Sequence, residues 1–389
     1  MTPEANNKGN DLRRRIRVLI AAPSLEIYGG QALMAARLVE RLRQEPTLTV
    51  AFQPHNPQLP RGFKWLQRLR YVRTLATTLA YLCMLLARAW RYDIIHVFTA
   101  SYYSYLLSAV PALLAGKLYG KKVILNYRSG EAADHLTRWP SAVRTLRWAD
   151  RIVVPSAYLA DLFARFHLPA TVVFNTIELE RFRYRERGSM RPLFVSARLL
   201  EPLYNVACTL RAFALIQQRY PDAQLTIAAD GTERGKLERL AGELGLRHTR
   251  FIGKVDYQQM PDLLDAADIY LNANDLDNMP SSLIECMAAG LAVVSTNAGG
   301  IPYIITHAET GLLVECNDHE AMARGAIRLL EDQALALSIA RRARRVCEKY
   351  RWAAVRSDWL KLYGELGDAK VKRRAAAPVD VKSISGDLL

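Results

Sequence analysis

The stretch DIYLNANDLDNMPSSLIECMAAGLAVVST, residues 268–296, contains a complete strand–helix–strand unit. It opens with an apolar run (268–273), continues through a polar loop, and enters a helical pattern from Pro280 to Gly290. Proline suits the first turn of a helix, and glycine suits the residue after its last turn. A second apolar run, AVVST (292–296), follows at once. Two buried strands joined by a helix predict parallel pairing in an α/β sheet.

The same alternation of apolar runs and helical patterns continues through the whole chain. Strands are expected in the first half at 17–22, 93–98, 122–127, 151–156 and 171–175. In the second half they are expected at 193–197, 224–229, 250–253, 268–273, 292–296 and 311–315, with helices such as 207–220 and 233–245 between them. The predicted fold class is therefore α/β, with two Rossmann-like, doubly wound parallel-sheet domains that face each other across a cleft.

The predicted domain boundary lies near RFRYRERGSMR (181–191), which is charged and lacks a strand pattern. The expected organisation is a flexible basic N-terminus (1–15), an N-terminal domain (16–185), a C-terminal domain (186–350), a C-terminal helix that returns to the N-terminal domain (351–368), and a disordered tail (369–389).

The excess positive charge lies in the first half of the chain. Residues 1–190 hold 28 Lys and Arg against 13 Asp and Glu, whereas residues 191–389 hold 25 of each. A basic half predicts an acidic partner, either a phosphorylated acceptor or an anionic membrane surface, and nucleic acid is less favoured. The alternative is a basic surface that serves solubility alone.

Cysteine usage and the N-terminus indicate a reducing compartment. The five cysteines show no CxxC spacing or pairing pattern, so neither a disulfide framework nor a zinc site is predicted. The first residues, MTPEANNKGNDLRRRIR, lack the apolar core of a signal peptide. We therefore expect a cytoplasmic protein, with peripheral binding to the inner face of the cytoplasmic membrane as a further expectation.

The segment LATTLAYLCMLLARAW (75–90) is strongly apolar but has fewer than the roughly 20 residues that a membrane-spanning helix needs. Its flanks mix basic and aromatic residues, as in a helix that lies on an anionic bilayer. A core helix of the first domain is the alternative.

The loop and helix of the opening stretch form a candidate anion site. Phosphate oxygens can accept hydrogen bonds from the free N–H groups at a helix N-terminus, here near Ser281 and Ser282, which we also expect to cap the helix. Asp277 lies before the helix and Glu285 within it. Such a pair of carboxylates suits the hydroxyl groups of a ribose and a sugar on either side of a diphosphate, although two solvated carboxylates are the alternative.

Two glycine pairs follow predicted strands. Gly299 and Gly300 lie after the strand at 292–296, and Gly29 and Gly30 lie between the first strand and the first helix. Glycine allows a backbone to approach a ligand closely and to offer N–H donors. Neither pair fits GxGxxG, so no dinucleotide redox cofactor is predicted.

Several segments taken together identify a family resemblance. YGGQALMAARLVERL, ADRIVVPSAYLADLF, VVFNTIELERF, SARLLEPLYNV, YPDAQLTIAADGTERGKLERLAGELGL, DNMPSSLIECMAAGLAVVSTNAGGIPYII and ETGLLV stand in this order. The sequence resembles, over roughly residues 16–366, the retaining family 4 glycosyltransferases of the GT-B fold, most similarly bacterial enzymes of cell-surface polysaccharide or glycolipid assembly. The resemblance implies an N-terminal acceptor-side domain and a C-terminal domain that binds a nucleotide sugar.

The resemblance also implies roles for individual residues. Glu285 matches the acid that holds the donor ribose, Asp277 stands where an acid contacts the transferred sugar, and Arg198 matches the arginine that binds the diphosphate. The further donor-binding candidates are Gly29, Gly30, Tyr204, Asn278, Ser281, Ser282, Asn297, Gly299 and Gly300.

Three positions depart from the family pattern. Tyr204 stands where a lysine usually follows the arginine, and Arg128 stands where a histidine is frequent. Arg128 could replace the lost positive charge or bind an acceptor phosphate, because guanidinium binds phosphate through two parallel hydrogen bonds. It is therefore a fourth catalytic candidate. Tyr303 stands where glutamate is usual.

Acceptor-side candidates lie in the first domain. They are His96, at the end of a predicted strand, and Glu131 and His135, at the start of a predicted helix. The alternatives are a histidine satisfied by its neighbours and a cluster that only caps the helix.

The resemblance implies a retaining, metal-independent transfer from a nucleotide-diphosphate sugar to a glycan or lipid-linked acceptor, without a bound cofactor. Two other functions stay open: a sugar-nucleotide-binding protein without transfer activity, and a nucleotide-sugar epimerase of the same fold. A pyridoxal-dependent phosphorylase is disfavoured because no lysine is placed for a Schiff base.

Overall fold

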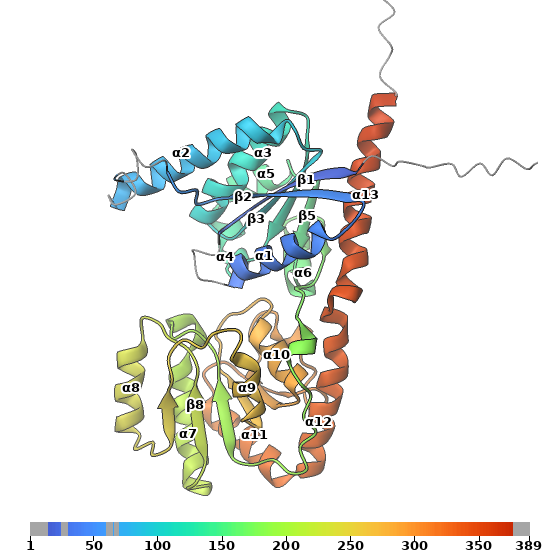
Figure 1. Ribbon diagram of the computed structural model, residues 1–389. Coiled ribbons are helices and arrows are strands. Elements are labelled where there is room, and N and C mark those ends of the chain that lie inside the picture. The colour runs from blue at the N-terminus through green and yellow to red at the C-terminus, as the bar shows by residue number, and fades with distance from the viewer. Residues whose placement is uncertain (1–14, 25–29, 60–64, 66–69, 376–389) are drawn as a thin grey trace, which may run out of the picture. The chain divides into compact units, whose positions relative to one another are not determined.

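The computed structural model describes residues 15–24, 30–59, 65 and 70–375 (Figure 1). The strands are β1 (Ile16–Ala22), β2 (Leu48–Pro54), β3 (Ile94–Thr99), β4 (Lys122–Tyr127), β5 (Arg151–Val154), β6 (Ala170–Val172), β7 (Leu193–Ser196), β8 (Gln224–Ile227), β9 (Thr249–Phe251), β10 (Ile269–Asn272), β11 (Ala292–Thr296) and β12 (Leu312–Val314). The α-helices are α1 (Gly30–Arg43), α2 (Arg70–Ala89), α3 (Val110–Leu118), α4 (Ala132–Arg138), α5 (Pro140–Leu146), α6 (Ala157–Arg165), α7 (Val206–Arg219), α8 (Arg234–Glu243), α9 (Met260–Asp265), α10 (Ser281–Ala289), α11 (His319–Glu331), α12 (Gln333–Val346) and α13 (Trp352–Ala375). The shorter helices are η2 (Tyr105–Ala109), η3 (Leu179–Arg181), η4 (Pro202–Tyr204), η5 (Ile301–Tyr303) and η6 (Cys347–Tyr350).

The strands form two six-stranded parallel sheets. The first has the order β2-β1-β3-β4-β5-β6, and the second has the order β12-β11-β10-β7-β8-β9. Counted from β7, the second order is that of the Rossmann fold, in which the chain starts at the centre and winds outward in both directions. In register, Phe194 of β7 pairs with Ile269 of β10, and Ile269 pairs with Ala292 of β11. The predicted α/β class with two Rossmann-like sheets is confirmed.

Alternation along the central strands explains why helices cover both faces of the second sheet. Phe194, Leu271 and Val294 belong to one buried cluster, which also contains residues of α7 and α11. Their neighbours Val195 and Tyr270 belong to a different cluster, which contains residues of α10. Because successive side chains of a strand point to opposite faces, a strand that is apolar on both faces requires helices on both.

The sequence analysis missed β2. Only Leu48 and Gln53 of this strand are buried, and its remaining residues are half-buried or exposed. It pairs with β1 alone, at the edge of the first sheet, and it ends at Pro54. An edge strand tolerates polar residues and a terminal proline, so the continuous apolar run that marked the other strands is absent.

Helix α2 differs from its prediction in length and in burial. It has 20 residues, and its segment Val72–Ala89 is long and apolar enough to cross a membrane by length and composition, with 17% of that segment buried. The predicted 16-residue length was therefore too short. The core-helix alternative is wrong for this helix, because most of its side chains are exposed or half-buried.

The chain forms two compact units. The first holds residues up to 126, 145–151 and 359–389, and the second holds 127–144 and 152–358. This division does not test the domain boundaries expected from the sequence, which stay predictions. Helix α13 continues to Ala375, which corrects the predicted start of the disordered tail at residue 369. The rest of that tail lies outside the described residues, as do residues 1–14 of the predicted flexible segment 1–15.

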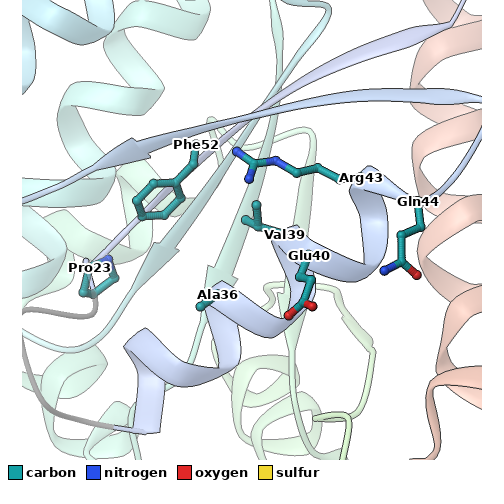
Figure 2. Close-up of a pocket in the computed structure, with 7 residues that line it drawn as sticks. All are labelled: Pro23, Ala36, Val39, Glu40, Arg43, Gln44 and Phe52. Carbon is teal, nitrogen blue, oxygen red and sulfur yellow. The ribbon is translucent and has the colours of Figure 1, made fainter.

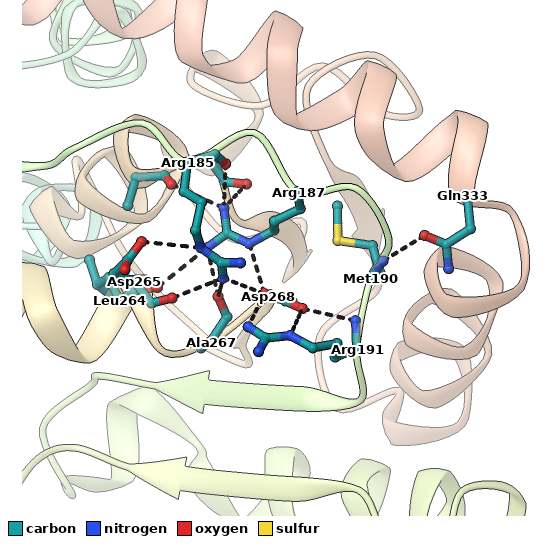
Figure 3. Close-up of polar contacts among 11 residues, drawn as sticks. Arg185, Arg187, Met190, Arg191, Leu264, Asp265, Ala267, Asp268 and Gln333 are labelled. Carbon is teal, nitrogen blue, oxygen red and sulfur yellow. Dashed lines mark hydrogen bonds and ion pairs between the residues drawn. The ribbon is translucent and has the colours of Figure 1, made fainter.

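The charged segment around residue 185 wraps a buried carboxylate (Figure 3). Asp268, fully buried, accepts hydrogen bonds from Arg185 (2.6 Å), Arg187 (2.9 Å) and Arg191 (2.8 Å). The Arg187 side chain is also fully buried, and it donates to the carbonyl oxygens of Ala267 and Gly290 as well. Burial alone would raise the pKa of Asp268, but the hydrogen bonds from the three arginines outweigh it and lower the pKa to about 2. This cluster ties the segment before β7 to the start of β10.

Candidate active site

The candidate site lies where the strand order of the second sheet reverses, between β7 and β10. Strand β7 leads directly to Arg198, and β10 leads to the loop that carries Asp277. These strands are neighbours, and the chain winds outward from them in opposite directions. In open α/β sheets the carboxyl ends of such strands leave a crevice that binds ligands. The fold therefore brings together two candidates that are 79 residues apart in sequence.

Arg198 is held from three sides. One terminal nitrogen, Nη1, donates to the hydroxyl of Ser282 (3.0 Å), and the other, Nη2, donates to the carboxylate of Asp277. The guanidinium carbon lies 4.4 Å from the centre of the Tyr204 ring. Within the described residues its buried Nε has no hydrogen-bond partner. An arginine fixed in this way still has its Nε donor available for a ligand.

Asp277 acts as a partner of Arg198. Its Oδ2 accepts from Arg198 and from the amide of Asn274 (2.6 Å), and its Oδ1 accepts from the backbone N–H of Asn278 (2.8 Å). Burial alone would lower the pKa of Arg198, but the charge of Asp277 and smaller contributions from other neighbours outweigh it and raise the pKa. The site thus keeps a permanent positive charge whose position the carboxylate fixes.

The N-terminus of α10 lies beside this arginine. The helix begins at Ser281 after Pro280, and no side chain caps it, so the expected capping by Ser281 and Ser282 is wrong. Ser282 instead accepts from the hydroxyl of Tyr270 (3.1 Å) and from Arg198. Glu285, 6% exposed, lies one turn further along the helix. Free N–H groups of a helix start, together with an arginine, favour an anion.

Gly299 and Gly300 pack directly against the loop that carries Asp277, so they do not border an open space. A Cβ on Gly299 would overlap the carbonyl oxygen of Asp277, and one on Gly300 would overlap that of Asn278. Gly299 has a φ of +52°, and the N–H of Gly300 donates to the Asp277 carbonyl (2.9 Å). The close approach predicted for this pair is therefore to the 277–278 backbone. Asn297, which precedes the pair, is exposed.

This packing makes Gly300→Ala a sensitive test of the loop. The added methyl group must displace the Asn278 carbonyl and with it Asp277. We expect the free energy of unfolding to fall by about 2 kcal/mol or more, measured by urea denaturation. The matched control is Gly242→Ala in α8, where nothing lies within 4 Å of the new Cβ. There a gain of about 0.5–1 kcal/mol is expected. Equal effects of the two substitutions would contradict the proposed packing.

The positions that depart from the family pattern have partners in the second compact unit. The Arg128 guanidinium donates to the side-chain oxygen of Asn175, and burial lowers the pKa of Arg128 to about 10, so it stays protonated at neutral pH. Two residues further on, a Cβ built on Gly130 would lie 3.7 Å from the backbone of Asp277 and 3.8 Å from that of Asn278. Tyr303 donates a hydrogen bond to Asp161 (2.7 Å). Arg128 is thus on a loop that reaches the Asp277 loop.

The acceptor-side histidines are both buried. His96 in β3 is fully buried, with Nδ1 at 2.7 Å from the Tyr363 hydroxyl and Nε2 at 3.1 Å from the Asn126 amide. This environment fits the structural alternative for His96. His135 in α4 contacts the hydroxyl of Tyr127 (2.7 Å), and burial lowers its pKa to about 4 against the opposing charge of Asp134. A neutral, enclosed imidazole of this kind stabilises the fold.

The remaining candidates are less informative. Glu131 is exposed at the start of α4 and makes no side-chain cap. Gly30 begins α1, whereas Gly29 lies outside the described residues. Within the described ranges, no group of three or more His, Cys, Asp or Glu side chains is arranged to hold a metal ion.

Two site residues were missed by sequence reasoning. Asn274 orients Asp277, and Tyr270 contacts Ser282. The Oδ1 atom of Asn274 is buried without a hydrogen-bond partner among the described residues, so it is a further group that a ligand could satisfy. The only signal in the sequence is the change from apolar to polar residues at the end of β10, in LNAN.

A separate cavity lies in the first compact unit (Figure 2). It has a volume of about 540 Å³ and is lined by Pro23, Ala36, Val39, Glu40, Arg43, Gln44 and Phe52. None of these lining residues is a predicted site residue. The Arg198 site, and not this cavity, therefore holds the groups that favour a phosphorylated ligand.

The chain matches two families of known enzymes and several individual proteins. A family model for glycosyl transferases group 1 matches residues 178–346, which contain the Arg198 site, and one for glycosyltransferase family 4 matches residues 28–181. The chain is 27% identical to a glycogen synthase of Mycobacterium tuberculosis over 71% of its own length and 69% of that protein. It is 28% identical to a phosphatidyl-myo-inositol mannosyltransferase of Mycolicibacterium smegmatis, over 51% of each chain.

The fold also matches solved structures. Anabaena HepE in complex with UDP-glucose superposes with a TM-score of 0.72 at 16% identity, covering 90% of this chain and all of that one. The two family models together span both sheets and the candidate site. The chain is therefore a glycosyltransferase, and it belongs to family 4 of these enzymes, with the GT-B fold.

Proposed function

We propose that this enzyme transfers a sugar, with retention of configuration and without a metal ion, from a nucleotide-diphosphate sugar to a glycan or lipid-linked acceptor. The observation that carries the proposal is Arg198, fixed by Asp277 and Ser282 beside the uncapped start of α10. Together they supply positive potential to the two phosphates of a leaving nucleoside diphosphate. The UDP-glucose complex of the HepE neighbour makes uridine nucleotides the first donors to test.

The proposed reaction breaks the bond between the anomeric carbon and the diphosphate oxygen. The acceptor hydroxyl attacks from the side of the leaving group, the new glycosidic bond forms there, and the departing diphosphate oxygen takes the hydroxyl proton. Glu285 accepts hydrogen bonds from the donor ribose in this scheme. Asp277 positions Arg198, since both of its oxygens already accept hydrogen bonds from the protein. Arg128 adds positive charge through the neighbouring loop.

The basic first half supports an acceptor at a membrane surface on the cytoplasmic side. Residues 1–190 hold 28 Lys and Arg against 13 Asp and Glu, and this positive charge suits a lipid-linked acceptor with phosphate groups.

Donor binding is tested by thermal shift with UDP, GDP, ADP, TDP and CMP and their common sugars, with and without EDTA. A ligand that binds the native state raises the melting temperature by mass action. We expect a shift for one nucleotide family that EDTA does not change, and that Glu285→Gln strongly reduces. The control is Glu238→Gln, a substitution in an exposed ion pair of α8.

Three outcomes would contradict parts of the proposal. A shift that disappears with EDTA would contradict metal independence. Donor binding without transfer or donor hydrolysis, across plausible acceptors, would favour a binding protein. Isomerisation of the donor sugar in the absence of acceptor would favour an epimerase.

A further inference from the structure

The first compact unit exposes an apolar stripe along α2. Val72, Leu75 and Leu79 are 38%, 73% and 58% exposed, and Trp90, just after the helix, is 53% exposed. With Cys83 and Leu86 between them, these residues recur every three or four positions, so they follow one line on the helix surface. A soluble monomer seldom exposes a continuous line of large apolar side chains unless it binds something there.

A neighbouring helix also exposes large apolar side chains. Helix α3 packs against α2 and exposes Leu114 (50%) and Leu118 (68%), and the preceding η2 exposes Leu106 (44%) (Figure 1). We call the exposed apolar residues of α2, η2 and α3, together with Trp90, the α2–α3 face. Its members come from two segments of the chain, so the exposure is not confined to a single frayed helix.

The α2–α3 face has a basic and aromatic border. Arg91 lies over the Trp90 ring at 5.0 Å, and Lys117 lies over the Trp148 ring at 4.7 Å. Lys121 donates to the backbone carbonyl of Trp90 (2.6 Å). Tryptophan and cationic side chains around an apolar surface are typical of proteins at the boundary between lipid headgroups and acyl chains.

Carboxylates are nearly absent from this part of the sequence. Residues 46–130 contain 11 Lys and Arg, at 61, 64, 68, 70, 73, 88, 91, 117, 121, 122 and 128, against a single acid, Asp93. Asp93 is already paired with Arg17 (3.2 Å). No acidic side chain of this segment therefore opposes the approach of an anionic surface.

Anchoring contacts keep α2 on the body of its unit. The Tyr81 hydroxyl donates to the Ser108 carbonyl (3.1 Å), and Arg88 donates to Gln53 (2.8 Å). Tyr81, Leu85 and Ala89 are fully buried along another side of the helix. A helix fixed along one side exposes its other side to a bilayer surface but does not cross the bilayer, even though its length would allow it.

We propose that the α2–α3 face is a docking surface for an anionic lipid bilayer, with its leucines inserted among the acyl chains and Arg91 and Lys117 at the headgroups. This inference deepens the membrane-proximal part of the proposed function. Its physical basis, an exposed apolar face with a basic border, does not depend on the transfer chemistry.

The test is flotation of the full-length protein with vesicles of phosphatidylcholine alone or mixed with phosphatidylglycerol. We expect binding to the anionic vesicles that rising salt weakens, at least tenfold weaker binding for Leu75→Gln/Leu79→Gln, and a lost preference for anionic lipid in Arg91→Glu/Lys117→Glu. The control is Ile252→Gln, because Ile252 is a comparably exposed side chain (46%) of the second unit. Melting curves check that each variant is folded. We expect the leucine variant to fold, because Leu75 and Leu79 are exposed.

A second readout uses Cys83, an exposed cysteine on the same stripe. In a Cys316→Ser background, a polarity-sensitive dye on Cys83 should shift to shorter wavelength with anionic vesicles and be quenched by lipids brominated near the headgroup. Equal vesicle binding by all variants, or no binding, would overturn the inference. So would light scattering that shows a dimer lost in Leu75→Gln/Leu79→Gln, since the face would then join two copies. Vesicle binding without a donor-induced thermal shift would contradict the proposed function alone.

Discussion

Arg198→Ala is expected to lower kcat/KM for sugar transfer by a factor of about 10²–10³, equivalent to about 2.7–4 kcal/mol of transition-state stabilisation. Negative charge develops on the diphosphate as the bond to the sugar breaks, and Arg198 is the cation, with a side chain 12% exposed, that Asp277, Ser282 and Tyr204 hold in place. A fixed cation in a site that excludes water needs no reorganisation when this charge appears. The effect should therefore be larger on kcat than on the dissociation constant of the donor.

The measurement is steady-state transfer, with the donor dissociation constant determined separately by calorimetry. Arg219→Ala, in an exposed pair with Glu331, is the control and should leave both quantities unchanged. Because Arg198→Ala also leaves Asp277 without its cation, the variant Arg198→Met/Asp277→Asn separates lost catalysis from an uncompensated charge. If this double variant regained activity, Arg198 would be a structural residue and the mechanism above would be wrong.

The strand–helix–strand unit at 268–296 is the part of the fold that the sequence predicts best. Its two strands are buried on both faces, so they are mostly apolar, and Pro280 and Gly290 mark the helix ends by local backbone chemistry. The edge strand β2 has neither signal, because five of its seven residues are half-buried or exposed. Local sequence patterns therefore predict buried strands, and they predict helices whose ends are marked by residues such as proline and glycine.

Sequence reasoning named most members of the candidate site, though not Asn274 and Tyr270, and it did not show their contacts. The pattern of Gly299 and Gly300 indicated a close approach, but only the fold shows that the approaching group is the 277–278 backbone. The pairing of Asp277 with Arg198 joins residues 79 positions apart, and no local pattern specifies it. His96, within β3, shows the opposite case, since a polar residue in an apolar strand fits a ligand site and a buried hydrogen bond equally well in sequence.

Asp268→Ala is expected to destabilise the protein by about 3–5 kcal/mol, the usual cost of removing one partner from a buried ion pair. The loss leaves the fully buried Arg187 guanidinium without its only carboxylate contact among the described residues, next to the positive charges of Arg185 and Arg191 (Figure 3). Urea denaturation at pH 7 measures the change. The control is Asp265→Ala, because Asp265 is half exposed and pairs with the same Arg185, and its loss should cost at most about 1 kcal/mol.

The low pKa of Asp268 adds a dependence on pH. Since its pKa is about 2 in the folded protein and 3.8 in the unfolded chain, the unfolded state binds the proton more tightly below pH 3.8. The stabilising contribution of Asp268 is therefore complete above pH 3.8 and is lost as the pH falls from 3.8 toward 2. The difference in unfolding free energy between wild type and Asp268→Asn should shrink over that interval and stay constant from pH 5 to 7. A difference that stayed constant down to pH 2 would show that the carboxylate charge does not hold the three arginines.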